Sequence, residues 1–246
     1  AGVQADLKTV SALGCYGMAA ITALTAQNTR GVQAVESISP EFFERQLDSL
    51  FSDIRIDAVK IGMLGEAEQI RILVGVLNRY GADRIVLDPL MVASSGDALI
   101  SSDALDVLKA EFIPLADLIT PNIPEAERLL RKAVLDCEQA ATDLLSLGAK
   151  AVLLKGGHGA GDTCVDILAT PDGLHRFESP RIETPNTHGT GCTLSSAIAA
   201  YLAKGCDMID AVARAKVYIT GAIENSDALS VGSGSGHGPV HHFWDT

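Results

Sequence analysis

The sequence predicts an α/β fold in which helices cover both faces of a mainly parallel central sheet. Apolar runs of strand length alternate with helical patterns along most of the chain, as in repeated strand–helix units. The runs are continuous rather than alternating, which indicates strands buried on both faces. No segment of the 246 residues reads as a linker, so we expect a single domain over residues 1–246.

Five apolar runs bounded by turn signals are the strand candidates. In chain order they are AAITALTA (19–26), DAVKIGML (57–64), RIVLDP (84–89), DLITPN (117–122) and KAVLLKGG (150–157). Each is short enough to be a strand of a buried sheet, and helical patterns lie between them. They are expected to be neighbours in the central sheet.

Helical patterns fill the segments between these runs. The clearest is SPEFFERQLDSLFSDI, in which Ser39 is suited to cap the helix and Pro40 to occupy its first position. Further helices are expected near 66–80, 102–112, 124–131, 138–147, 191–204 and 207–226. The opening AGVQADLKTVSALG also reads as the start of a helix, so we expect that the natural chain begins earlier.

Two segments do not fit the strand–helix alternation. VDILATPDGLHRFES (165–179) predicts two strands about the turn TPDG, hence a small antiparallel excursion at one sheet edge. The tail VGSGSGHGPVHHFW is rich in glycine and serine and then apolar. It is either a flexible end or a loop that crosses a ligand.

The composition of the chain limits the classes of partner that it is expected to bind. The net charge is −12, from 19 basic and 31 acidic residues, which argues against nucleic acid and acidic membranes as partners. The five cysteines are widely spaced, with no CxxC, so a disulfide framework is not expected and a cytoplasmic location fits. No membrane span or secretory signal is visible in the sequence.

Polar residues follow the predicted strands. In open parallel sheets, ligands bind beyond the carboxyl ends of the strands. Gln27, Met63, Asp88, Asn122 with Glu125, and Lys155 to His158 come after successive apolar runs. Any one of them is explained equally well as a strand exit. Two carboxylates and a lysine at one rim, together with the loop described next, favour a binding site.

The loop THGTGC stands directly before a helical run of small residues. Gly189 and Gly191 permit unusual backbone angles and close approach of a ligand. The N–H groups at a helix start favour a phosphate. Neither GxxxxGK[ST] nor GxGxxG occurs in the chain, so a P-loop and a Rossmann dinucleotide site have no support.

THGTGCTLSSAIAAYLAKG is similar to the C-terminal signature of ribokinase-like kinases, whose loop forms an anion hole at a helix N-terminus. Further segments resemble the vitamin-kinase branch: AGVQADLKTVSALGCYGMAAITALTAQNTRGVQ, KIGMLG, VLDPLMVASSGDALI, LITPNIPEAERLL, LLKGGH and GHGPVHHF. In order and over essentially the whole chain, the sequence resembles the hydroxymethylpyrimidine/phosphomethylpyrimidine kinases of thiamine biosynthesis. That resemblance implies a ribokinase-like fold. It also implies ATP-dependent phosphorylation of 4-amino-5-hydroxymethyl-2-methylpyrimidine and of its monophosphate.

The resemblance assigns roles at the phosphate end of the site. Asp88 and Glu125 would hold Mg²⁺, partly through water, because Mg²⁺ usually takes few carboxylates and keeps several waters. Asn122, Lys155 and Thr190 would contact ATP. The N–H groups from Gly189 through Gly191 to Cys192 would receive the transferring phosphoryl group.

The resemblance also assigns the substrate pocket. Gln27 would hydrogen-bond the aminopyrimidine edge, with Gly2, Met63 and Leu90 around the ring. The family often has Glu at the position of Gln27; both accept from an amino group, but only Gln also donates. A homodimer is expected as well.

Cys192 stands where most ribokinase relatives carry an aspartate base. A helix N-terminus lowers the pKa of a cysteine from about 8.5, so we expect a thiolate able to take the proton of the substrate hydroxyl. The alternative is a small residue packed at a helix start. For the whole chain, two alternatives remain: a pyridoxal kinase, and a non-catalytic sensor of vitamin precursors.

Overall fold

The computed structural model describes residues 1–91, 100–157, 161–232 and 236–245. Its centre is a six-stranded sheet in the order β3-β4-β5-β6-β7-β8. The strands are β3 (Val59–Ile61), β4 (Ile85–Leu87), β5 (Leu118–Ile119), β6 (Val152–Leu154), β7 (Thr163–Thr170) and β8 (Gly173–Pro180). The first four are parallel, and β7 and β8 extend the sheet antiparallel. Both the mainly parallel sheet and its antiparallel edge were predicted.

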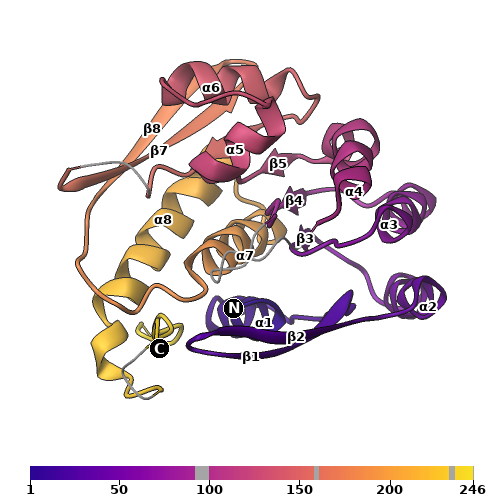
Figure 1. Cartoon of the computed structure of the whole chain (residues 1–246), viewed down its shortest axis with the longest axis horizontal. Helices are drawn as coiled ribbons and strands as arrows, with labels where there is room; N and C mark the ends of the chain where they lie inside the picture. The colour runs from indigo at the N-terminus through magenta and orange to yellow at the C-terminus, as the bar shows by residue number, and fades with distance from the viewer. Residues whose placement is uncertain (92–99, 158–160, 233–235, 246) are drawn as a thin grey trace.

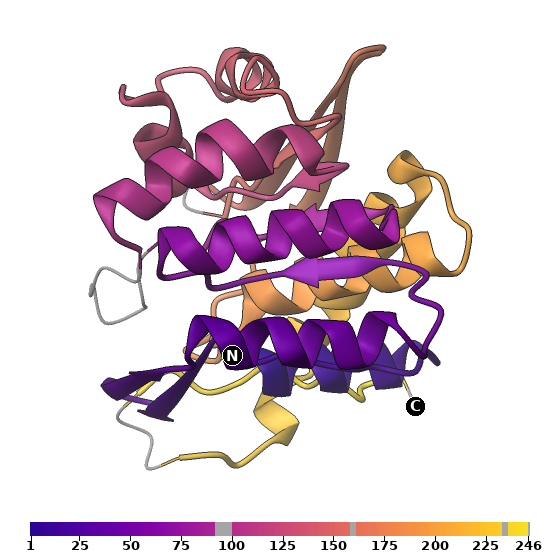
Figure 2. The ribbon, with the colours of Figure 1, turned by 90° about the vertical axis from the view of Figure 1, so that its right-hand side faces the viewer.

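Alternate residues of each central strand face opposite layers of helices, as strand geometry requires. Leu87 packs into a core with Phe43 and Leu73, whereas Val86 packs into a second core with Ile198. The first layer holds α2 (Pro40–Phe51), α3 (Ala67–Tyr80), α4 (Ser102–Val107, continued by a π-helical turn Leu108–Phe112), α5 (Ile123–Leu130) and α6 (Cys137–Leu145). The second layer holds α7 (Thr190–Ala203) and α8 (Met208–Glu224). Figures 1 and 2 show these layers on either side of the sheet.

The helix ends match the sequence signals. Ser39 accepts a hydrogen bond from the N–H of Phe42, and Pro40 begins α2, while Phe43 and Leu47 form its buried face. Helix α7 is buried on nearly all sides by the sheet, by α8 and by α1 (Val3–Ala12). Its small residues permit this close packing, and the Ser195 hydroxyl bonds back to the Gly191 carbonyl at 3.0 Å.

The expectation for residues 19–26 was wrong. Strand β1 (Ala23–Asn28) lies outside the central sheet and pairs antiparallel with β2 (Gly31–Ser37), a strand that was not predicted. The intervening turn is held by Asn28, whose side chain accepts from the N–H of Arg30 at 2.9 Å. All of β1 after Ala23 is exposed. The run of Ala, Thr and Leu was predicted to be a buried strand, whereas it forms part of an exposed hairpin.

The tail packs onto the domain over its described residues. The N–H of His237 donates to Thr29 at the hairpin turn, the carbonyl of Gly238 accepts from His188, and the N–H of His241 donates to Ala222 on α8. Residues 236–245 are thus a packed segment rather than a flexible end. Within the ranges given above, no helix is both long and apolar enough to cross a membrane.

Candidate active site

A cavity of about 1290 Å³ lies beyond the carboxyl ends of β3 to β6 and extends between α1, α2 and the β1–β2 hairpin. It brings together every site residue nominated from the sequence. These are Gly2, Gln27, Met63, Asp88, Leu90, Asn122, Glu125, Lys155, Gly189, Thr190, Gly191 and Cys192. They come from seven separate chain segments, so their convergence is a product of the fold. His158 and the segment VASSGDAL (92–99) lie outside the described residues.

Two carboxylates and a lysine form the charged centre of the cavity. Lys155 Nζ lies 2.8 Å from Asp88 Oδ1 and 4.0 Å from Glu125 Oε2. Thr120 donates a further hydrogen bond to Asp88 at 3.1 Å. Burial alone would raise the pKa of Asp88, but the charges of Lys155 and Lys60 hold it below its ordinary value. Asp88 is therefore ionised at neutral pH.

Glu125 is fixed by the start of α5. Its side chain accepts from the N–H of Asn122 at 2.8 Å, and the Asn122 side chain accepts from the N–H of Glu125 at 2.9 Å, which makes a reciprocal capping box. Burial raises the pKa of Glu125 to about 7, against the opposing charge of Lys155. The charges around this carboxylate do not fully compensate it. A hard cation would, so the carboxylate pair fits a Mg²⁺ site.

The glycine-rich loop meets this charged centre at the start of α7. Gly189 has φ 87° and occupies the N-cap position, a left-handed conformation suited to glycine. A Cβ at Gly191 would lie 3.4 Å from Lys155 Nζ and 3.6 Å from Asp88 Oδ2. Among the described residues, no side chain caps α7. The N–H of Thr190 donates to the Thr187 carbonyl at 3.3 Å, so in the described part of the chain the N–H groups of Gly191 and Cys192 are those available to an anion beside Lys155.

Cys192 lies in the first turn of α7 and is 7% exposed. The structure contradicts the lowered thiol pKa expected from the sequence. Burial raises the pKa of the Cys192 thiol, and the opposing charge of Lys60 does not offset this. A helix N-terminus lowers the pKa of an accessible thiol, but here the cost of desolvating a thiolate is larger.

The sequence reading missed Lys60. This lysine lies in β3, its side chain is 9% exposed, and it donates to Asp6 Oδ1 at 3.0 Å. Ser196 on α7 donates to the same oxygen at 2.7 Å. All three residues line the cavity. The only sequence signal was a lysine inside the apolar run DAVKIGML, since Asp6 is explained equally well by helix capping.

The residues nominated for the substrate ring line the same cavity. Gln27 is exposed on β1, and Gly2, with φ 62°, is the N-cap of α1. The carbonyl of Met63 accepts from the Thr22 hydroxyl at 2.9 Å. Leu90 follows Asp88, and its N–H bonds to the Asp88 carbonyl at 2.7 Å. Gln27 thus lies on an element with few buried contacts, unlike the charged centre.

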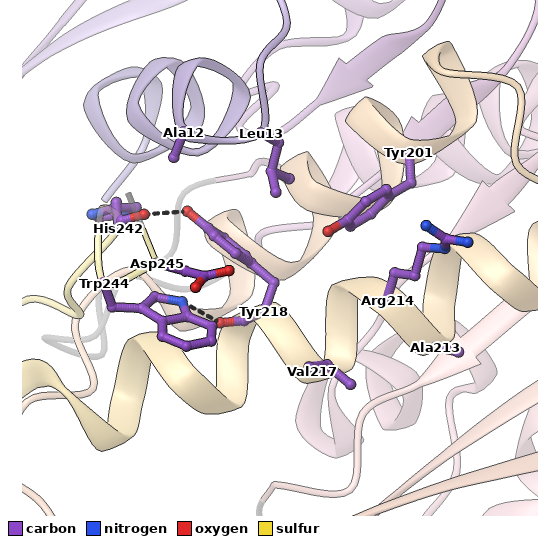
Figure 3. Close-up of a pocket in the computed structure, with 10 residues that line it drawn as sticks. All are labelled: Ala12, Leu13, Tyr201, Ala213, Arg214, Val217, Tyr218, His242, Trp244 and Asp245. Atoms are coloured by element: carbon purple, nitrogen blue, oxygen red, sulfur yellow. Dashed lines mark hydrogen bonds between the residues drawn. The ribbon is translucent and has the colours of Figure 1, made fainter.

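A second, smaller pocket of about 340 Å³ lies between α1, α8 and the tail. Figure 3 shows its ten lining residues, none of which was nominated from the sequence. Tyr218 donates to the carbonyl of His242 at 2.7 Å, and Trp244 Nε1 donates to the carbonyl of Tyr218 at 3.1 Å. These bonds attach the tail to α8. Because the residues nominated from the sequence line the larger cavity and not this pocket, we assign the chemistry to the larger cavity.

The family model for phosphomethylpyrimidine kinase matches residues 1–241. The chain belongs to the phosphomethylpyrimidine kinase family. It is 51% identical over 247 residues to the hydroxymethylpyrimidine/phosphomethylpyrimidine kinase of Rhizobium meliloti, covering 99% of this chain and 92% of that protein. It is 54% identical over 246 residues to a thiamine biosynthesis bifunctional protein of Geobacter sulfurreducens. There the match covers 99% of this chain but only 49% of the longer relative.

Solved kinase structures share the fold. A phosphomethylpyrimidine kinase from Clostridium difficile has a TM-score of 0.80 at 44% identity, covering 91% of this chain and 93% of that one. An ADP complex of Bacillus subtilis pyridoxal kinase has a TM-score of 0.89 at 34% identity, covering 98% of this chain and 92% of that one. Fold similarity is thus shared with the pyridoxal kinases. Sequence identity is higher to the phosphomethylpyrimidine kinase.

These matches confirm the predicted ribokinase-like fold and the family. The chain is a phosphotransferase, because the full-length relatives at about half identity are kinases. A non-catalytic sensor is therefore not supported. The ADP complex of the Bacillus subtilis relative supports ATP as the co-substrate. The pyridoxal kinases are distant structural relatives.

Proposed function

We propose that this kinase transfers the γ-phosphoryl group of ATP to the hydroxymethyl group of 4-amino-5-hydroxymethyl-2-methylpyrimidine. It then phosphorylates the resulting monophosphate, in thiamine biosynthesis. One observation carries the proposal: Asp88, Glu125, Lys155 and the uncapped start of α7 meet in one cavity. Positioning and neutralisation of phosphate charge are what phosphoryl transfer chiefly requires.

The phosphate end of the cavity would hold ATP. Lys155 would neutralise phosphate charge, with Asn122 and Thr190 beside it. Asp88 and Glu125 would hold Mg²⁺, which would supply positive charge to neutralise the phosphates. The uncompensated burial of Glu125, whose pKa is raised to about 7, supports a cation at this place.

The first transfer forms one bond and breaks one. The hydroxymethyl oxygen attacks the γ-phosphorus, the bond to the β,γ-bridging oxygen breaks, and its electron pair leaves with ADP. The N–H groups of Gly189, Gly191 and Cys192 would stabilise the charge on the transferring group. Cys192 would accept the hydroxyl proton. Because burial raises the pKa of this thiol, only its minor thiolate form can take the proton, and a loose transition state demands little from the base.

The pyrimidine would lie between Gly2, Met63 and Leu90, with the Gln27 amide at its amino edge. All four residues line the same cavity as the charged centre. Because Gln27 lies on the exposed hairpin, substrate binding would order this hairpin over the ring.

Two further properties are part of this proposal. A cytoplasmic location is supported by five cysteines that are all free, as in a reducing compartment. A homodimer is supported by Leu24 and Val35, which are exposed large apolar residues on the hairpin. Size-exclusion chromatography with light scattering tests the homodimer, and a mass of about 26 kDa, close to the 25.7 kDa of the chain, would contradict it.

The experiment compares three acceptors in parallel: the aminopyrimidine alcohol, its monophosphate and pyridoxal. ADP release would be measured with Mg·ATP at saturation. The proposal expects turnover of both pyrimidines at a higher kcat/KM than pyridoxal. Preference for pyridoxal would instead favour the alternative suggested by the similarity in fold to pyridoxal kinases.

A further inference from the structure

Lys60 is a buried cation that the mechanism above does not use. Its side chain is 9% exposed and lines the cavity. Among the described residues it donates one hydrogen bond, to Asp6. An ammonium has three N–H donors, so two remain available within the cavity. Burial alone would lower the pKa of Lys60, but the negative charges of Asp6 and Asp88 help to raise it, so the ammonium stays charged, and its two remaining donors can bind an anionic ligand.

The position of this ammonium is fixed from three elements. Asp6 on α1 receives both Lys60 and the Ser196 hydroxyl of α7 on one carboxylate oxygen. A Cβ at Gly62 would lie 3.0 Å from Lys60 Nζ, so the glycine leaves the space that the ammonium occupies. The network holds the cation in place without covering it.

Lys60 and Lys155 have different ion-pair partners in the cavity. Lys155 is paired with Asp88 and faces Glu125, the end proposed for ATP. Lys60 is paired with Asp6 instead, and it is the largest favourable charge acting on the thiol of Cys192. Its hydrogen-bonded network with Asp6 and Ser196 lies on α1 and α7, so we place this ammonium on the acceptor side of the glycine-rich loop.

The two proposed acceptors differ in charge at this place. The alcohol is neutral, whereas the monophosphate carries a charge of about −1.5 to −2 at neutral pH. Both must present an oxygen to the same γ-phosphoryl group. In the second reaction, an additional phosphate must therefore fit between the pyrimidine and the loop, beside Cys192.

We propose that Lys60, oriented by Asp6 and Ser196, binds the phosphate of the monophosphate acceptor and makes the second phosphorylation possible. This inference rests on the proposed function. In the second transfer, an ionised phosphate oxygen attacks the γ-phosphorus of ATP, the bond to the β,γ-bridging oxygen breaks, and ADP leaves with its electron pair. The attacking oxygen is already ionised, so no proton needs to be removed and Cys192 is not required as a base.

The inference predicts opposite effects at two residues. Lys60→Met should lower kcat/KM for the monophosphate by roughly 10- to 100-fold, as for one lost hydrogen bond to a charged group. It should change kcat/KM for the alcohol by less than about threefold. Cys192→Ala should do the reverse, lowering kcat for the alcohol far more than for the monophosphate. Both acceptors are assayed with the full chain and saturating Mg·ATP.

Two further variants separate charge from folding. Lys60→Met combined with Asp6→Asn leaves no carboxylate without its lysine partner and should show the same selective loss. Gly62→Ala keeps the charge but displaces the ammonium. It should raise the KM for the monophosphate more than the KM for the alcohol. Lys150→Met is the matched control, because Lys150 pairs with Asp117 outside the cavity. It should leave both activities unchanged.

Equal losses for both acceptors in Lys60→Met would overturn the inference and assign Lys60 to a step common to both reactions. Loss for neither acceptor would overturn it as well. Failure of the wild-type chain to phosphorylate either pyrimidine would instead contradict the proposed function, so the two failures are distinguishable.

Discussion

At the scale of single residues, the chemistry depends on buried charges that compensate one another only in part. Asp88 and Lys155 form a close pair, whereas Glu125 lies 4.0 Å from the same ammonium and its pKa is raised to about 7. A buried carboxylate whose charge is only partly compensated is stabilised by a bound metal cation. When no cation is bound, its ionised form destabilises the fold.

Glu125→Gln should therefore affect activity and stability in opposite directions. Gln preserves the capping box but not the metal-binding charge, so turnover should fall by at least about 100-fold. The folded pKa of about 7 lies above the unfolded value of 4.5. The stability that protonated Glu125 provides is complete below 4.5 and is lost as the pH rises through 7. Without metal, the variant should therefore be more stable than wild type at pH 8, by about 1–3 kcal/mol.

Urea unfolding at pH 4.5 and pH 8, with and without Mg²⁺, measures this effect. The two proteins should be equally stable at the lower pH. Addition of Mg·ATP at pH 8 should stabilise the wild type more than the variant. An equal stability difference at both pH values would show that Glu125 ionisation is not responsible.

Cys192→Ala tests the base. If the Cys192 thiolate accepts the hydroxyl proton, kcat for the alcohol should fall by roughly 10²- to 10⁴-fold, with little change in ATP affinity, because the backbone N–H groups remain. Burial raises the pKa of this thiol. The wild-type rate should therefore rise with pH beyond the ordinary thiol range, and the alanine variant should lack this rise. A loss under about threefold would reduce Cys192 to a packing residue.

Sequence patterns located most of the site residues but not Lys60. Asp88, Asn122 and Lys155 follow apolar strands, and topology alone brings strand ends together. Lys60 lies inside such a run, and its partner Asp6 is 54 positions away. Its role depends on a tertiary contact between β3, α1 and α7, which no local pattern reveals. The thiol pKa was mispredicted because burial cannot be read from a helix N-terminus.

At the scale of elements, the tail and α7 stabilise each other. Thr193 on α7 and His242 of the tail share a hydrogen bond of 3.1 Å, and Tyr218 on α8 donates to the His242 carbonyl. Burial lowers the pKa of His242 to about 4. The tail thus depends on a neutral imidazole.

Acid should loosen this contact. The folded pKa of His242 lies below its ordinary value of 6.5. Its contribution to stability is therefore complete above pH 6.5 and is lost as the pH falls through 4. Wild type should lose about 1–2 kcal/mol between these limits through this residue, and His242→Gln should lose correspondingly less. Thermal unfolding across pH 4–7 measures the difference, and identical pH slopes would exclude His242 as the cause.

The β1–β2 hairpin is the element whose position was mispredicted, and it carries Gln27. If the Gln27 amide binds the pyrimidine edge, Gln27→Ala should weaken pyrimidine binding by about 1–3 kcal/mol and leave ATP binding nearly unchanged. Calorimetric titration with each ligand measures both. Asn28→Ala is a control for the turn, because Asn28 holds it through Arg30. Equal losses of both ligands in Gln27→Ala would indicate general damage.

At the scale of the whole molecule, the central sheet and its helices were predictable because strands buried on both faces must be apolar. The strands β4, β5 and β6 are buried at every position, and their apolar runs stand out from the surrounding sequence. The hairpin was not predictable in this way, because its residues are exposed and its pairing leaves no burial pattern. The role of the tail follows only from its backbone hydrogen bonds to the rest of the domain. These bonds join it to Thr29, His188 and Ala222.

The topology of the whole molecule explains why residues from seven segments line one cavity. Parallel strands end at one edge, and the starts of α1 and α7 meet there: a Cβ at Gly189 would lie 3.5 Å from the Cα of Ala1. We propose that this edge is a phosphoryl-transfer site in which Asp88 is indispensable.

The most direct test is kcat for the aminopyrimidine alcohol with Asp88→Asn, followed by phosphorus NMR at saturating Mg·ATP. Asn has nearly the same shape as Asp and still accepts from Thr120, so circular dichroism should match that of the wild type. We predict a loss of at least about 10²- to 10³-fold, with the phosphorylated pyrimidine as the wild-type product. Near-normal turnover by the folded variant would contradict the account.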